Sequence, residues 1–355
     1  MKGLILSGGK GTRLRPITYT SAKQLVPVAN KPVLFYGLEA LAEAGIREIG
    51  IVVGDTAAEI RAAVGDGSKW GVTVTYIEQD APRGLAHAVL ISEAYLAGEP
   101  FVMYLGDNLL NHSITRFVQE FEQRKPAAQI LLAHVPDPQM FGVAELAGDR
   151  VVRLVEKPKE PKSDLALVGV YMFSRAVFES VKRIRPSARN ELEITEAIQD
   201  LIDRGLDVHP HIVEGWWKDT GKLEDLLEAN RLILDTIARR VDGAVDAESR
   251  VEGKVIVERG ATIERSVVRG PVIIGTGARI AGAYIGPFTA IGDGVQLRDT
   301  EIEHSIVLEG AVITDLATRI EDSLIGRNVR IYRMPVRPVA YRFMLGDNSE
   351  VGIRW

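Results

Sequence analysis

Leu4-Ile-Leu-Ser-Gly-Gly-Lys-Gly-Thr-Arg-Leu14 is an apolar run that leads into a glycine-rich loop, and Lys23 follows it closely in the chain. The pattern predicts a β-strand and then a turn in which glycines let several backbone N–H groups approach a polyphosphate. Arg13 and Lys23 would neutralise negative charge that develops on phosphorus, so we expect both to be catalytic. The alternative is a plain strand-to-helix turn whose cations are solvated.

The loop fits neither of the two commoner phosphate-binding templates. Position 14 is a leucine, so the third glycine of the dinucleotide fingerprint is missing. No Gly-Lys-Ser/Thr run closes a P-loop either. The remaining signature, Gly8-Gly-Lys-Gly-Thr-Arg-Leu-Arg-Pro16 with Lys23-Gln-Leu-Val-Pro-Val28, resembles the nucleotide-binding motif of sugar-1-phosphate nucleotidyltransferases.

The composition excludes several classes of protein. A length of 355 residues is enough for two domains, and a net charge of −5 argues against general nucleic-acid binding. The chain has no cysteine, which excludes disulfides, thiolate catalysis and cysteine-ligated zinc and is typical of a reducing compartment. The first apolar run is too short for a signal peptide, and no apolar stretch of about 18 residues follows. We therefore expect a cytoplasmic protein without a membrane partner.

Residues 1–240 have the pattern of an α/β domain. The apolar runs are 49–53, 72–77, 101–105 and 130–135, and the segments with helical spacing between or before them are 33–44, 57–64 and 85–96. This alternation predicts a sheet with helices on both faces. Residues 222–240 are expected to form a long amphipathic helix that closes the domain, and 241–246 to form a linker.

Beyond residue 240 the apolar period changes to six. The recurring residues are Val257, Ile263, Val268, Ile274, Ile280, Ile285, Ile291, Leu297, Leu308 and Ile320. This period predicts a parallel β-helix over 241–355, with three short strands per coil and the branched residues pointing inward. Small loops are expected near 280–285 and 302–308, and residues 335–355 are expected to cap the last coil or pack on a neighbouring subunit. The alternative is an ordinary β-sandwich.

Two aspartates are candidate metal ligands. Asp107 follows an apolar strand in Tyr104-Leu-Gly-Asp-Asn108, and Asp219 ends an apolar-aromatic segment in Trp216-Trp-Lys-Asp-Thr-Gly221. In open α/β sheets, ligands bind at the carboxyl ends of strands. The two carboxylates could therefore hold Mg²⁺, which would bridge the phosphates of a nucleotide. Each aspartate taken singly could instead be a turn or helix-cap residue.

Two further segments could bind substrate. Glu156 and Lys157 follow an apolar strand and could hold a sugar hydroxyl and an anomeric phosphate, or could form a solvated charged turn. The amide of Gln79 could pair with the edge of a pyrimidine, and the backbone at Gly84 could complete that contact. The alternative is a plain loop before a helix. His87 on that helix is expected to be a packing or surface residue rather than a metal ligand.

Assembled in order, the motifs resemble those of the long form of the glucose-1-phosphate thymidylyltransferases. To the loop and lysine motifs above, the chain adds 30–32, Gln79 with 84–86, 105–108, 141–143, 156–158, 191–195 and 217–221. The resemblance implies a nucleotide-diphosphosugar transferase core with a Rossmann-like mixed sheet, followed by a left-handed parallel β-helix of hexapeptide repeats. One departure is Gly84-Leu-Ala-His-Ala88, where the family commonly has glutamine in place of His87.

The resemblance also implies a reaction and a role for each matching residue. The substrates would be dTTP and α-D-glucose 1-phosphate, the products dTDP-glucose and pyrophosphate, and the cofactor Mg²⁺. Arg13 and Lys23 would stabilise the transition state, while Asp107 and Asp219 would position the metal. The residues implied in nucleotide binding are Leu6, Gly8, Gly9, Gly11, Thr12, Gln79 and Gly84. Those implied in sugar-phosphate binding are Asn108, Gly142, Glu156, Lys157, Gly169 and Arg189.

Other functions remain open at this point. The enzyme could use UTP, because one methyl group on the base is worth only about 1–3 kcal/mol in an apolar pocket. It could be bifunctional, with a β-helix that acetylates an amino sugar phosphate. It could also be a regulatory homologue that binds nucleotide sugars without turnover. A β-helix with exposed flanks favours a homo-oligomer.

Overall fold

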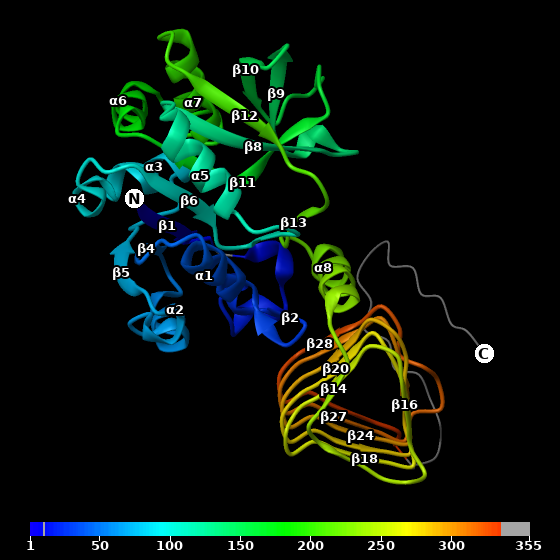
Figure 1. The fold of residues 1–355 in the computed structure, drawn as a ribbon. Helices are drawn as coiled ribbons and strands as arrows, with labels where there is room; N and C mark the ends of the chain where they lie inside the picture. Colours follow the sequence, from blue (N-terminus) through cyan, green and yellow to red (C-terminus); the bar gives the residue numbers. More distant parts are fainter. Residues whose placement is uncertain (10, 335–355) are drawn as a thin grey trace.

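The computed structural model describes residues 1–9 and 11–334, and it has two parts (Figure 1). The amino-terminal part is a sheet covered by helices, and the carboxyl-terminal part is a prism of short strands. The expected capping role of residues 335–355 lies outside the described residues. No helix of the described part is both long enough and apolar enough to cross a membrane.

A nine-stranded mixed sheet forms the centre of the amino-terminal part. Its main order is β10-β9-β11-β6-β1-β4-β5, with β8 beside β11 and β12 beside β8. Strand β1 is parallel to β4 and β6, whereas β11 is antiparallel to β6, β8 and β9. The predicted Rossmann-like mixed sheet is therefore confirmed. The bounds are β1 Lys2–Ser7, β4 Glu48–Val53, β5 Thr73–Glu78, β6 Phe101–Leu105, β8 Ala128–His134, β9 Gly142–Ala147, β10 Arg150–Glu156, β11 Leu165–Phe173 and β12 Val208–Ile212.

Among its described residues, this part also has two small antiparallel pairs, eight α-helices and short 3₁₀ turns. The pairs are β2 Pro27–Val28 with β3 Lys31–Pro32, and β7 Asn108–Leu110 with β13 Trp217–Asp219. The α-helices are α1 Val33–Glu43, α2 Ala57–Val64, α3 Leu85–Ile91, α4 Glu93–Leu96, α5 Thr115–Arg124, α6 Ala176–Arg183, α7 Ile194–Asp203 and α8 Leu223–Thr236. Three 3₁₀ turns lie near the glycine-rich loop: η1 Thr12–Leu14, η2 Ile17–Tyr19 and η3 Lys23–Leu25.

Two predicted helices differ from the structure. The single helix expected over 85–96 is broken at the buried Ser92, whose hydroxyl donates to the carbonyl of Ala88 at 2.7 Å and competes with the helical pattern. The helix expected to reach residue 240 ends at Thr236. The predicted linker is also wrong, because β14 (Arg240–Val241) and β15 (Ala244–Val245) already pair with later coils.

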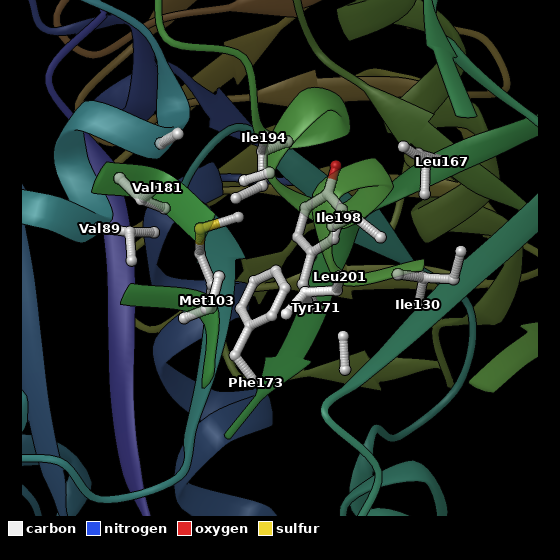
Figure 2. Close-up of a cluster of buried hydrophobic side chains, with 14 of the residues drawn as sticks. Val89, Met103, Ile130, Leu167, Tyr171, Phe173, Val181, Ile194, Ile198 and Leu201 are labelled. Atoms are coloured by element: carbon white, nitrogen blue, oxygen red, sulfur yellow. The ribbon is translucent and has the colours of Figure 1, made fainter. Parts of the chain in front are cut away.

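The sheet packs on both faces because its strands alternate. Along β6, Phe101 and Met103 face one core, while Val102 and Tyr104 face the other. Figure 2 shows the first core, where Met103 and side chains of β11 meet residues of α3, α6 and α7. Both faces of the sheet are therefore apolar, and each needs the helices that the sequence predicts to cover it.

The carboxyl-terminal part is a left-handed parallel β-helix with three faces. One face holds β14, β17 Val255–Val257, β20 Val272–Ile274, β23 Thr289–Ile291, β26 Ile306–Val307 and β28 Leu324–Ile325. The second holds β15, β18 Thr262–Glu264, β21 Arg279–Ala281, β24 Gln296–Arg298, β27 Val312–Thr314 and β29 Arg330–Tyr332. The third holds β16 Arg250–Glu252, β19 Val267–Arg269, β22 Tyr284–Ile285 and β25 Glu301–Ile302.

The coils are shorter than three hexapeptides. Val268 pairs with Ile285 and Ile285 with Ile302, so each of these coils has 17 residues. One side of every such coil has five residues. The shorter apolar spacing at 280–285, where a small loop was expected, is this five-residue side. The loop expected at 302–308 is also wrong: Val307 is the fully buried inward residue. Leu308 instead points outward and packs against the amino-terminal part.

Glycine in one Ile-Gly pair is required by close contact between coils. The backbone φ of Gly275 is not positive, so the glycine is not needed for a left-handed turn. A Cβ there would lie 2.7 Å from the backbone nitrogen of Asp293 in the next coil. A side chain would therefore push two coils apart.

The two parts share an apolar cluster that includes residues of the glycine-rich loop and of the segment after Lys23. It contains buried residues from the glycine-rich loop, the lysine segment, α8 and the first β-helix face: Leu14, Val26, Val28, Leu226, Leu234, Ile273, Ala290, Ile306 and Leu308 among others. Asn230 of α8 lies in this interface and is 1% exposed. It accepts from the backbone nitrogen of Ala29 at 2.9 Å and donates to the carbonyl of Phe288 at 3.0 Å. The β-helix is therefore tied to the turn that follows Lys23.

We expect Asn230→Ala to lower the free energy of unfolding by about 1–3 kcal/mol, because Ala29 and Phe288 each lose a hydrogen-bond partner in a buried interface. Urea denaturation measures this change. Asn111→Ala is the matched control, since Asn111 is exposed, and it should leave the midpoint unchanged. Equal stability of the two variants would show that the bridge does not hold the parts together.

Candidate active site

Two adjoining hollows open at the carboxyl ends of the central strands. The larger has a volume of 630 Å³ and the smaller 230 Å³, and Leu85 and Leu105 line both. Strands β1, β4 and β6 are parallel and adjacent, so the loops after them meet at this edge. The cleft therefore lies where the alternation of strands and helices predicts a ligand site.

The smaller hollow collects most of the residues predicted to bind a nucleotide. Those on its wall are Leu6, Gly8, Gly9, Gln79 and Gly84, and the wall also includes Lys23, predicted to be catalytic, and Asp107, predicted to be a metal ligand. Gly11 and Thr12 are not on the wall of either hollow. Gly11 has a φ of +61°, and a Cβ there would lie 2.7 Å from the Cβ of Lys23. Its structural contribution is to let the glycine-rich loop and the lysine segment touch.

A cluster of four charged side chains lies where the two hollows meet. Lys23 forms an ion pair with Asp107, and these side chains are only 12% and 18% exposed. Burial acts to lower the pKa of Lys23, but the charges of Asp107 and Asp219 outweigh it and raise the pKa. Burial likewise acts to raise the pKa of Asp107, and the Lys23 charge outweighs it and lowers the pKa. The Arg13 side chain lines the larger hollow, and its charge also acts on Asp219.

The β7–β13 pair brings the two aspartates together from distant parts of the sequence. Asp219 is paired with Asn108, the residue after Asp107. Thr220 secures the arrangement, because its backbone nitrogen and its hydroxyl both donate to the carbonyl of Asp107, at 2.9 and 2.8 Å. Burial and the charge of Asp107 raise the pKa of Asp219 to about 6. The two carboxylates thus repel each other and favour an added cation.

The donor set fits a magnesium ion better than a transition metal. The buried Oδ1 of Asp219 has no hydrogen-bond partner within residues 1–9 and 11–334. The same part of the chain holds no group of three His, Cys, Asp or Glu side chains that could bind a metal. Mg²⁺ usually takes one or two carboxylates and fills its other positions with water and phosphate oxygens. Asp107 and Asp219 therefore fit the predicted cofactor.

The larger hollow contains most of the residues predicted to bind the sugar phosphate: Asn108, Gly142, Glu156, Lys157 and Gly169. Asn108 is oriented by the indole of Trp217, which donates to its Oδ1 at 2.6 Å. A Cβ at Gly169 would clash with the Asn108 amide, and a Cβ at Gly142 would lie 2.6 Å from a methyl of Thr195. Both glycines therefore leave room for neighbouring polar side chains.

Arg189 does not line either hollow. Its guanidinium pairs with Glu156 at 2.9 Å, with Glu193 at 2.9 Å and with Glu191 at 3.6 Å. Burial and the charge of Glu193 raise the pKa of Glu156, with Lys157 and Arg189 opposing them. In this arrangement Arg189 offsets the charge of three glutamates. Its binding to the phosphate of the sugar phosphate stays a prediction.

Sequence reasoning missed several residues of the cleft. Trp217 and Thr220 orient Asn108 and Asp107, while Lys218, Lys222 and Asp225 line the larger hollow. All five lie close to Asp219 in the sequence, and this proximity could have identified them as candidate site residues. His87 was expected to have a packing or surface role, but its Nδ1 lies 3.0 Å from the Nε2 of Gln79.

Known proteins resemble this chain over most or all of its length. The family described as Nucleotidyl transferase matches residues 2–236. A glucose-1-phosphate thymidylyltransferase of Streptomyces antibioticus is 57% identical over 356 aligned positions, which cover 100% of both chains. A low-salt glycan biosynthesis nucleotidyltransferase of Haloferax volcanii is 48% identical over 99% of both chains. The solved structure of a UDP-glucose pyrophosphorylase complexed with UDP-glucose is 26% identical with a TM-score of 0.59, and it covers 66% of this chain and 98% of its own.

Proposed function

The chain belongs to the nucleotidyl transferase family, and we propose that it transfers a thymidylyl group from dTTP to α-D-glucose 1-phosphate, giving dTDP-glucose and pyrophosphate. The cluster of Arg13, Lys23, Asp107 and Asp219 carries the proposal, because it lies where the two hollows meet, and we assign the smaller hollow to the nucleotide and the larger one to the sugar phosphate. The full-length similarity to a named thymidylyltransferase supports the choice of substrates.

The mechanism follows from the charges of the reactants. An oxygen of the sugar phosphate is already an anionic nucleophile, so no general base is required. It attacks the α-phosphorus of the nucleotide in line, the new P–O bond forms, and the bond to the pyrophosphate leaving group breaks. The protein must align two polyanions that repel each other. Lys23 lines the smaller hollow and Arg13 the larger one, and we assign to them the role of offsetting the negative charge between the reactants.

Asp107 and Asp219 would hold Mg²⁺ beside these cations. When bound, the ion would supply positive charge to the phosphate oxygens of the nucleotide. Lys23 forms an ion pair with Asp107. In the proposal, Lys23 contacts the triphosphate while Asp107 binds the cation.

The two hollows would divide recognition of the substrates. Gln79 and Gly84 would read the base in the smaller hollow, and Gly142, Glu156 and Gly169 would line the glucose site in the larger one. We place Lys157 beside the sugar phosphate, because its side chain lies on the same wall as Glu156. We also propose that the protein is a cytoplasmic homo-oligomer with no nucleic-acid or membrane partner.

Pyrophosphate release across a matrix of nucleoside triphosphates and sugar 1-phosphates tests the proposal. The pair of dTTP and glucose 1-phosphate should give the largest kcat/KM. A clear preference for UTP would favour a uridylyltransferase, an activity related to the UDP-glucose pyrophosphorylase that shares the fold. No release with any pair would favour a regulatory homologue, and acetyl-CoA-dependent modification of an amino sugar phosphate would favour a bifunctional enzyme.

A further inference from the structure

The Gln79 amide has two different neighbours in the smaller hollow. Gln79 follows β5, and its Nε2 lies 3.0 Å from Nδ1 of His87, which projects from α3. Its Oε1 lies on the opposite side, 2.8 Å from the position that a Cβ of Gly8 would occupy. The amide therefore has its nitrogen toward an imidazole and its oxygen toward the glycine-rich loop.

The imidazole determines which end of the amide can face it. A neutral ring that carries its proton on Nε2 has Nδ1 as an acceptor, so it pairs with the N–H donors of Gln79. A doubly protonated ring has an N–H at Nδ1 as well and would pair with the carbonyl oxygen of the amide. Protonation of His87 would thus favour a reversed Gln79 amide, with the nitrogen toward Gly8.

We propose that His87 is a positioning residue for base selection: by holding the Gln79 amide in one orientation, it makes the nucleotide site favour a base with a hydrogen on N3 over a base without one. The inference rests on the proposed function, in which Gln79 reads the base. His87 does not line the hollow itself, whereas Gln79 does, so His87 acts through Gln79.

The chemistry of the pyrimidine edge explains why this orientation matters. Thymine and uracil present an N3–H donor between two carbonyl acceptors, whereas cytosine presents an N3 acceptor beside an amino donor. With one Nε2 hydrogen held by His87, Gln79 keeps a carbonyl acceptor for N3–H. The reversed amide offers donors instead and suits the N3 acceptor of cytosine. The preference of the site for thymine or uracil over cytosine would then fall.

Burial and a neighbouring cation favour the neutral form of the His87 ring. Burial and the Arg83 cation lower the pKa of His87, and Asp80 opposes them. Arg83 and Asp80 pair with each other at 2.6 Å in the loop before α3. On the neighbouring helices, Lys182 of α6 pairs with Glu93 of α4, and Glu191 lines the same hollow from the segment before α7. Because the pKa is lowered, the neutral ring is present above it and the protonated ring only in more acidic solution.

The test measures the ratio of kcat/KM for dTTP to kcat/KM for dCTP at saturating glucose 1-phosphate. The ratio is followed from pH 8 down to a pH of about 5.5. In the wild-type protein the ratio should fall by about tenfold as His87 protonates, the effect of one misplaced hydrogen bond. His87→Asp places an acceptor without a donor beside Gln79, and it should keep the ratio high at every pH. His87→Leu holds neither orientation, so it should give a low ratio that changes with pH only through protonation of cytosine itself.

Gln79→Ala separates positioning from a structural effect of the ring. In a Gln79→Ala background, His87→Leu should no longer change the dTTP to dCTP ratio, because the group that His87 positions is absent. Protonation of cytosine itself affects every variant alike, and His87→Leu measures that contribution. A wild-type ratio in His87→Leu, or an undiminished effect of His87→Leu in the Gln79→Ala background, would overturn the inference.

Binding measurements separate this inference from the proposed function. Calorimetric Kd values for dTTP and dCTP require neither turnover nor a sugar phosphate, and their ratio should follow the same pattern across the variants. If the protein prefers UTP, the ratio of UTP to CTP should change in the same way, because uracil also has a hydrogen on N3. Absence of turnover would therefore contradict the proposed reaction alone. A Kd ratio that is the same in the wild type and in His87→Leu would contradict the positioning role.

Discussion

Replacing Lys23 by methionine should lower kcat by roughly two to three orders of magnitude at saturating substrates, the usual effect of removing one preorganised donor from a charged transition state. Methionine keeps much of the length of the side chain and removes its charge. Lys23 is 12% exposed and pairs with Asp107, and Asp219 also acts on its pKa. Its loss would leave two carboxylates close together with only Arg13 and any bound metal to offset them. Steady-state pyrophosphate release measures the change.

The stability of the Lys23→Met variant should also fall, because removal of one partner leaves a buried charge uncompensated, at a cost of about 3–5 kcal/mol. Arg13→Ala separates catalysis from folding. Arg13 is exposed, so this variant should lose turnover to a similar extent and keep its unfolding midpoint. Arg15→Ala is the control, because Arg15 stacks over the ring of Tyr19, 4.8 Å from its centroid, and lines neither hollow. Near-wild-type turnover of Arg13→Ala would show that Arg13 does not have the catalytic role proposed for it.

Asp219→Asn and Asp107→Asn should each raise the Mg²⁺ concentration needed for half-maximal activity by at least about tenfold. An amide keeps the shape of the side chain but loses the charge that holds the cation. The effect of Asp219→Asn is expected to be the clearer one, since Asp107 also pairs with Lys23 and its loss disturbs that cation too. The measurement is a Mg²⁺ titration of the initial rate at fixed, saturating substrates.

Asp225→Asn is the matched control for the metal site. Asp225 lines the larger hollow with Asp219, but it faces the cations of Lys218 and Lys222. Its half-saturating Mg²⁺ concentration should stay close to that of the wild type. If all three variants require the same Mg²⁺ concentration as the wild type, the ion is not held by Asp107 and Asp219.

Much of the candidate site could be predicted because its residues lie at ends of periodic segments. Asp107 follows β6, Gln79 follows β5, and Glu156 ends β10, so the strand pattern already places them near an edge of the sheet. Local geometry adds Gly11, whose positive φ favours glycine. The ion pair of Lys23 with Asp107 could not be predicted from spacing, because 84 positions separate the two residues and only the folded sheet brings them together.

The two kinds of architecture could be predicted from repeat periods, since the periods of two, 3.6 and six residues are local consequences of strand, helix and coil geometry. Details that depend on neighbours distant in the chain could not be predicted in this way. The coil length of 17 residues follows from strand pairing, and the outward position of Leu308 follows from contact with the other part of the chain. Likewise, three glutamates surround Arg189, and His87 contacts Gln79 across a loop and a helix turn. Side-chain contacts of this kind depend on the tertiary packing of segments that are distant in the sequence. A local sequence pattern carries no information about that packing.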